Sequence, residues 1–192
     1  GIAASRTGGL TANTGTMVKS THPGNASRMG AEAAILARSG FTANPDVLEK
    51  CHGYADALFH GDMEWDIVTG GLGASYRIAE PGFDIKRFPA QITMQRLIES
   101  VLNLREAHGF SPDDVEHLTV EVRGQGHSGP IPISGLDGKF SIEYCAAAAL
   151  LDGGVNIETF TDQRRFSPDM EAMLPRVSVS PRDSDSARAV AR

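Results

Sequence analysis

The sequence contains little cysteine, no excess of basic residues and no long apolar run, and each of these features excludes a class of protein. The 192 residues include two cysteines, Cys51 and Cys145, too few for a disulfide framework or a cysteine-rich zinc site. A net charge of −6 provides no basic excess for binding nucleic acid or an anionic membrane. No apolar run approaches the ~18 residues of a membrane span, and no amino-terminal signal is present. We therefore expect a cytoplasmic protein that binds neither nucleic acid nor membranes.

The amino-terminal residues look like the interior of a longer chain. Gly1-Ile2-Ala3-Ala4 lacks an initiator methionine and is typical of the middle of an apolar helix. This favours a fragment, a domain or a processed chain. The length allows one large or two small domains.

The spacing of apolar residues predicts a mixture of helices and strands. Apolar positions that recur every three or four residues, with glycine at the end, indicate a helix, whereas strict alternation indicates a strand. The predicted helices cover residues 25–39, 44–58, 92–108 and 141–151, and another begins at residue 167. The predicted strands cover residues 118–122 and 177–179. This order is typical of an α+β protein.

Glycine and proline mark a domain boundary. Several glycines and a proline disfavour helices and strands between the second predicted helix and Lys86, which places the boundary near residue 80. The last residues, 182–192, are polar and flanked by alanine, so we expect a frayed tail.

Two segments come close to catalytic motifs without completing them. In residues 14–21, Met17 and Val18 separate Gly15 from the lysine, so a phosphate-binding loop cannot form. In residues 126–130, a proline follows directly where a nucleophile elbow needs the start of a helix. We therefore expect neither a nucleotide site nor a serine hydrolase.

The six histidines show no spacing typical of metal ligands. His52 and His60 lie near one predicted helix, but eight positions place them about 80° apart around it. The sequence therefore predicts no metal site.

Lys86 lies in an apolar-framed basic loop directly before the predicted helix 92–108. A lysine close to a helix amino terminus can bind a carboxylate, because the helix dipole and the free N–H groups also favour an anion. A basic loop residue is more often simply solvated, so this position alone leaves both interpretations open.

Three segments resemble, in the same order, the signatures of the MmgE/PrpD family. The first is GTMVKSTHPGNA with GAEAAILA and GFT, in residues 15–42; the second is IKRFPA, in residues 85–90; the third runs from KFS through YCAAA to LLDG, in residues 139–153. The resemblance extends over residues 1 to about 180. The family comprises lyases and isomerases without a cofactor, among them 2-methylcitrate dehydratases, cis-aconitate decarboxylases and iminodisuccinate epimerases.

The resemblance implies a domain organisation. Family members have a large all-α domain and a smaller α+β lid, with the active site between them, and usually form homodimers. Residues 1–78 would then be the carboxyl-side part of the all-α domain. Residues 79–180 would form a two-layer α+β lid with an antiparallel sheet, and residues 181–192 a flexible tail. The amino-terminal helical half and its acid–base residues are expected outside this chain.

The resemblance also assigns site residues. Lys19 and Lys86 match the lysines of the first and second signatures and would act in catalysis and substrate binding. His22 would either contact the substrate or order the loop, and Gln91 would be a secondary polar contact. Two fixed ammonium groups can bind carboxylates and stabilise the charge that builds when a neighbouring proton or CO₂ is lost. No metal or cofactor is expected.

One departure from the family leaves the activity open. Many members carry histidines where this chain has Gln91 and Gln95, and glutamine cannot shuttle a proton near neutral pH. We expect a fragment of a lyase or isomerase that acts on a small polycarboxylate by dehydration, decarboxylation or epimerisation. Whether this chain alone is an enzyme stays open, and the alternative is a non-catalytic binding or regulatory module derived from the same fold.

Overall fold

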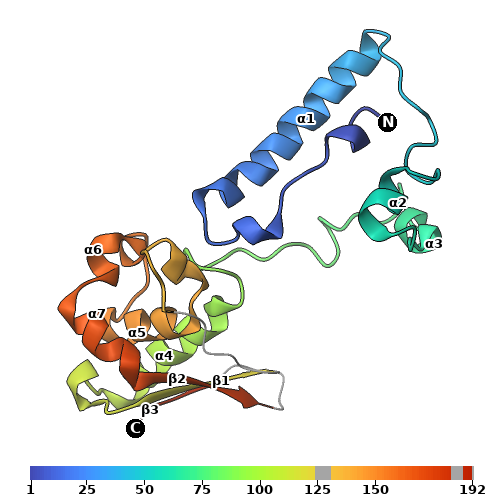
Figure 1. Cartoon of the computed structure of the whole chain (residues 1–192). Coiled ribbons are helices and arrows are strands. Elements are labelled where there is room, and N and C mark those ends of the chain that lie inside the picture. Colours follow the sequence, from blue (N-terminus) through green and yellow to red (C-terminus); the bar gives the residue numbers. More distant parts are fainter. Residues whose placement is uncertain (124–130, 183–187, 192) are drawn as a thin grey trace. The chain divides into compact units, whose positions relative to one another are not determined.

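The computed structural model describes residues 1–123, 131–182 and 188–191, and it divides into two compact units, Gly1–Asp84 and Ile85–Arg192 (Figure 1). The helices are α1 (Thr21–Arg38), α2 (Tyr54–Phe59), α3 (Trp65–Thr69), α4 (Met94–His108), α5 (Ile142–Asp152), α6 (Asp162–Arg165) and α7 (Pro168–Met173). The strands are β1 (Leu118–Arg123), β2 (Val177–Arg182) and β3 (Arg188–Ala191). Short 3₁₀ helices include η3 (Met17–Ser20) and η5 (Asp137–Phe140). Among the described residues, no helix is long and apolar enough to cross a membrane.

Helix α1 is the longest element of the first unit, and the sequence predicts it well. It begins four residues before the predicted start and includes Pro23 in its first turn, where a missing N–H costs nothing. Its end is fixed by Gly40, which has a φ of +86°. The N–H of Gly40 donates to the carbonyl of Ala37 at 3.0 Å, and that of Phe41 donates to Leu36 at 3.0 Å. This pair of bonds is a Schellman motif, for which glycine is the preferred residue.

Of the predicted helix over residues 44–58, only the end is helical, and the prediction for residues 44–53 was wrong. The structure has turns up to His52 and a short helix, α2, from Tyr54 onward. The break occurs because His52 has a φ of +61°, which no α-helix accommodates. Gly53 then passes so close to the preceding turn that a β-carbon there would lie 2.4 Å from the carbonyl oxygen of Val47. Only glycine fits this reversal.

The core of the second unit surrounds α5. Every side chain from Tyr144 to Leu150 is fully buried, and α4 packs against this helix with Leu97, Ile98 and Val101. Ser141 begins α5 by accepting a hydrogen bond from the Tyr144 N–H at 3.1 Å, and Gly153 ends it with a φ of +65°. The alanine-rich sequence lets neighbouring elements approach from all sides, which explains the complete burial.

The sheet has the strand order β2-β1-β3, with the helices of this unit on one face, as Figure 1 shows. The mixed α+β composition is confirmed. The prediction of an antiparallel sheet was wrong, because β1 and β2 pair in parallel from Leu118↔Val177 onward. The chain passes through α5, α6 and α7 between these strands and returns in the same direction, as a parallel crossover requires. Within the segment for which the sequence predicts a flexible tail, β3 pairs antiparallel with β1.

Candidate functional site

The segment that carries Lys86 is held to α4 by the side chain of Gln95. The amide oxygen of Gln95 accepts the N–H of Phe88 at 2.9 Å, and the amide nitrogen donates to the carbonyl of Phe88 at 3.0 Å. Phe88 and Ala90 are buried beside it, whereas Lys86 is exposed. The loop is therefore anchored on its apolar side and presents its lysine to solvent.

The positive charge of the neighbouring Arg87 is paired with a carboxylate of the same unit. Its guanidinium donates to Glu99 on α4 at 2.8 Å and lies over the ring of Phe88, 5.3 Å from the ring centre. Both members of this ion pair are about half exposed or more, so the pair contributes little stability. It does orient Arg87 along α4.

Gln91 forms a backbone hydrogen bond with another basic residue, Lys139. The backbone N–H of Gln91 donates to the carbonyl of Lys139 at 3.0 Å, and the Gln91 side chain accepts a hydrogen bond from Thr93. The Lys139 ammonium lies 5.5 Å from the centre of the Phe160 ring. The sequence did not predict this contact, because nothing in it indicates that residues 91 and 139 meet.

The second unit has a cavity of about 840 Å³, whose lining includes Arg87, Phe88 and Arg164. Arg164 donates to Asp152 at 2.7 Å and to Asp169 at 2.9 Å, so its charge is already matched by two carboxylates. It is therefore a poorer anion site than the segment with Lys86 and Gln91.

In the first unit, Lys19 lies in η3, directly before α1. The turn is stabilised by the hydroxyl of Ser20, which donates to the Met17 carbonyl at 2.6 Å, and by that of Thr21, which donates to Val18 at 2.7 Å. Lys19 is exposed. The segment that resembles a phosphate-binding loop is thus the 3₁₀ entry into a helix.

His22 lies in the first turn of α1 and lines a cavity of about 400 Å³. Its half-buried ring packs against Gly9, where a β-carbon would lie 3.1 Å from the Nδ1 atom. Thr7, Asn25 and Tyr54 line the same cavity. These groups can hydrogen-bond a small ligand, and His22 both lines the cavity and packs against Gly9.

The carboxylate of Glu32 neutralises Arg6 beside this cavity. It accepts hydrogen bonds from Arg6 at 2.6 Å and from Arg28 at 2.7 Å, which lower the pKa of Glu32. Lys19 and His22 are the binding residues that the sequence predicts in the first unit, and Lys86 and Gln91 those in the second. The serine motif of residues 126–130 lies outside the described residues.

Comparison with known proteins covers both units. Residues 1–66 match the model of the MmgE/PrpD N-terminal domain, and residues 88–191 match that of the MmgE/PrpD C-terminal domain. The chain belongs to the MmgE/PrpD family. The two matched regions lie on either side of the division between Asp84 and Ile85.

Two curated relatives are both cis-aconitate decarboxylases. The Homo sapiens protein is 27% identical over 184 residues and the Mus musculus protein 26% identical over 185 residues. Each alignment covers 93% of this chain but 38% of the relative. The chain thus spans well under half the length of these MmgE/PrpD proteins.

Proposed function

We propose that this chain is part of a lyase, one that needs no cofactor and acts on a small polycarboxylate, and that decarboxylation is the reaction to test first. Its membership of the MmgE/PrpD family and its similarity to two cis-aconitate decarboxylases support the reaction class. The observation that carries the proposal is the anchored loop before α4, which presents Lys86 while Gln91 contacts Lys139.

The charge of these groups suits the chemistry. Loss of CO₂, or of a proton beside a carboxylate, leaves negative charge on an enolate-like species. Fixed ammonium groups stabilise that charge more strongly than they stabilise the starting acid, which lowers the barrier. Isomerisation through the same species would use the same stabilisation.

We assign separate roles to the predicted residues. Lys19 and Lys86 bind substrate carboxylates, and Gln91 donates a hydrogen bond to the substrate. His22, at the cavity of about 400 Å³ in the first unit, orders the loop at Gly9 and contacts the ligand. The proton-transfer residues belong to the part of the relatives' length that this chain does not cover, and the active assembly is a homodimer.

The glutamine at position 91, where many family members have histidine, favours a second candidate function. In it, the chain is a binding or regulatory module without turnover. Glutamine can bond a carboxylate but cannot carry a proton near neutral pH. In that case the lysines would still bind a polycarboxylate, and no product would form. Binding and turnover must therefore be measured separately.

The test is calorimetric titration of the chain with cis-aconitate, citrate and aspartate, with product formation followed by NMR. Lys19→Ala and Lys86→Ala should each weaken binding at least about tenfold, since each removes one charge-assisted contact. Lys50→Ala, which removes another exposed lysine of the chain, is the matched control and should bind as the wild type does. Unchanged affinity in both site variants would refute carboxylate binding by Lys19 and Lys86. Binding without product by this chain fits both candidates, so turnover is also measured in a longer protein that includes the proton-transfer residues, where binding without product would favour the module.

A further inference from the structure

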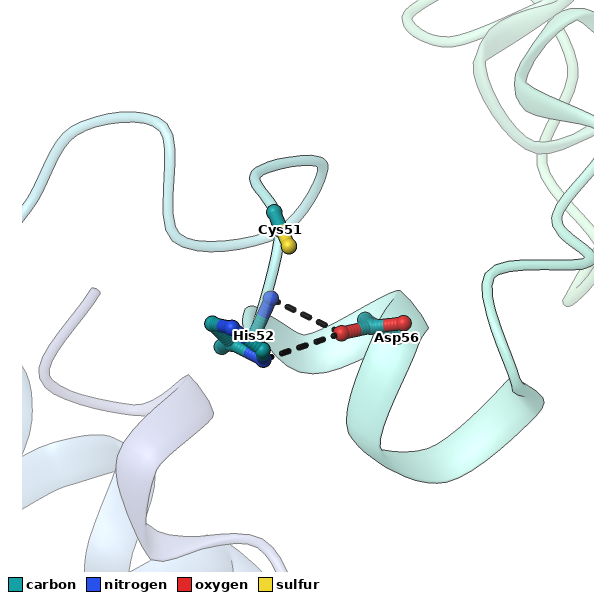
Figure 2. Close-up of side chains that lie close together, drawn as sticks. All are labelled: Cys51, His52 and Asp56. Carbon is teal, nitrogen blue, oxygen red and sulfur yellow. Dashed lines mark hydrogen bonds and ion pairs between the residues drawn. The ribbon is translucent and has the colours of Figure 1, made fainter.

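Cys51, His52 and Asp56 gather three different metal-binding groups at the start of α2. The cysteine sulfur, a histidine ring nitrogen and a carboxylate oxygen all lie within 4.8 Å of one another. Figure 2 shows the three side chains at the turn before the helix and on its first turn. All three are exposed, so an ion from solution can reach them.

The backbone, not chance contact between long side chains, brings these groups together. The φ of +61° at His52 ends the preceding turn and sends the chain into α2. Asp56 then lies four residues further on, and its carboxylate accepts the N–H of His52 at 2.8 Å. The same oxygen lies 3.5 Å from Nδ1 of the His52 ring. One ligand pair is thus held by a main-chain bond before any ion arrives.

The ligand set matches a particular class of ion. A thiolate, an imidazole and a carboxylate are all ligands of Zn²⁺, and three protein ligands leave a fourth position for water. Bond lengths of about 2.0–2.3 Å around a tetrahedral centre place ligand atoms roughly 3.3–3.7 Å apart. The present separations, up to 4.8 Å, exceed this by about 1.1–1.5 Å at most, which rotation of exposed side chains can close. Hard ions such as Mg²⁺ prefer all-oxygen sites and would be excluded by the sulfur.

We propose that Cys51, His52 and Asp56 bind Zn²⁺ or a similar borderline divalent ion, with one coordination position open to solvent. The site is independent of the polycarboxylate chemistry, because neither Lys19 nor Lys86 contributes to it. Bound metal would add a link between the turn that ends at His52 and α2, beside the hydrogen bond from His52 to Asp56 and the backbone bonds from Tyr54 to Val47 and from Ala55 to Leu48. The spacing between histidines does not indicate this site, since its proposed ligands are one histidine, the cysteine before it and an aspartate.

The test is titration of the reduced, tag-free chain with Co²⁺, followed by displacement with Zn²⁺. Cobalt bound to a thiolate gives a charge-transfer absorption band, and Zn²⁺ should abolish it. Cys145 is fully buried, so the band reports Cys51. Cys51→Ser should remove the band. Asp56→Asn and His52→Asn should each weaken Zn²⁺ binding at least about tenfold, as even indirect supporting groups at metal sites do.

The control variant is His60→Asn. His60 is exposed and also has a positive φ, of 54°, at the end of the same helix. Asparagine tolerates this conformation, so both histidine variants should keep the fold, which circular dichroism checks. His60→Asn should bind as the wild type does. Absence of the band in the wild type, its persistence in Cys51→Ser, or equal loss in the two histidine variants would overturn the proposal.

Discussion

The side chain of Gln95 forms a two-point hydrogen bond with the backbone of Phe88, with distances of 2.9 Å and 3.0 Å. One amide group supplies the donor and the acceptor that a neighbouring strand would otherwise provide. A carboxylate lacks the donor, and an imidazole carries its donor and acceptor on different sides of the ring. This pairing gives glutamine at this position a structural role: it holds the segment that presents Lys86.

Removal of the Gln95 amide should destabilise the second unit. Gln95→Ala leaves the N–H of Phe88 without its partner and removes one of the two hydrogen bonds to the Phe88 carbonyl, which also accepts the N–H of Ala90 at 2.8 Å. The loss should lower the free energy of unfolding by about 1–3 kcal/mol. Gln95→Glu should cost at least as much, because it places a carboxylate against carbonyl oxygens. Urea titration monitored by circular dichroism measures both. Arg96→Ala, on the exposed face of the same helix turn, should change stability by less than about 0.5 kcal/mol.

The two cysteines should differ sharply in reactivity. Burial raises the pKa of the Cys145 thiol to about 12, and its sulfur donates to the Gly138 carbonyl at 3.4 Å. Because the thiolate is the reactive form, the native chain should react with a disulfide reagent at one thiol and the denatured chain at two. The Cys51→Ser variant should be unreactive until it is denatured. Rapid reaction of two thiols in the native wild type would contradict the burial of Cys145.

Helices α4 and α5 of the second unit were predictable because local signals end them, whereas the short helix α6 was not predicted. Gly109 and Gly153, both with a φ of +65°, follow α4 and α5 where the sequence predicts the helices to stop. The direction of pairing between β1 and β2 was not predictable, since alternation of apolar residues is the same in either direction. It depends on the route of the chain through three intervening helices.

The candidate site was predictable only in part, for the same reason. The resemblance points to Lys86 and Gln91, but the contact between Gln91 and Lys139 joins residues 48 positions apart and leaves no local signal. Likewise, the cluster of Cys51 and His52 with Asp56 depends on a positive φ at a histidine, which sequence spacing does not reveal.

Asp169 should make the stability of the second unit depend on acid. Partial burial would raise the pKa of this carboxyl group, but hydrogen bonds from Ser167 and Arg164 outweigh it and lower the pKa. A depressed folded pKa stabilises the fold above the unfolded pKa of about 3.9, and the contribution is lost as the pH falls through the folded value. Between about pH 6 and pH 3, the urea midpoint of Asp169→Asn should therefore fall less than that of the wild type.

The matched control for this pH dependence is Asp113→Asn, which changes an exposed aspartate of the same unit. Its urea midpoint should follow that of the wild type at both pH values. Identical acid sensitivity of wild type and Asp169→Asn would show that the bond between Arg164 and Asp169, 2.9 Å long, contributes nothing to acid stability.

The first unit should associate through its exposed apolar side chains. All 84 of its residues are described, and its buried apolar side chains are Ala33 and Ala55, whereas Ile67 is 72% exposed and Leu72 75% exposed. Several large apolar residues exposed in one short segment favour association. Static light scattering should show a mass that rises with concentration, and Ile67→Gln with Leu72→Gln should reduce the rise. Ile157→Gln, which removes an isoleucine of equal exposure (71%) from the second unit, should not. A constant mass of 20.4 kDa for the wild type would contradict association.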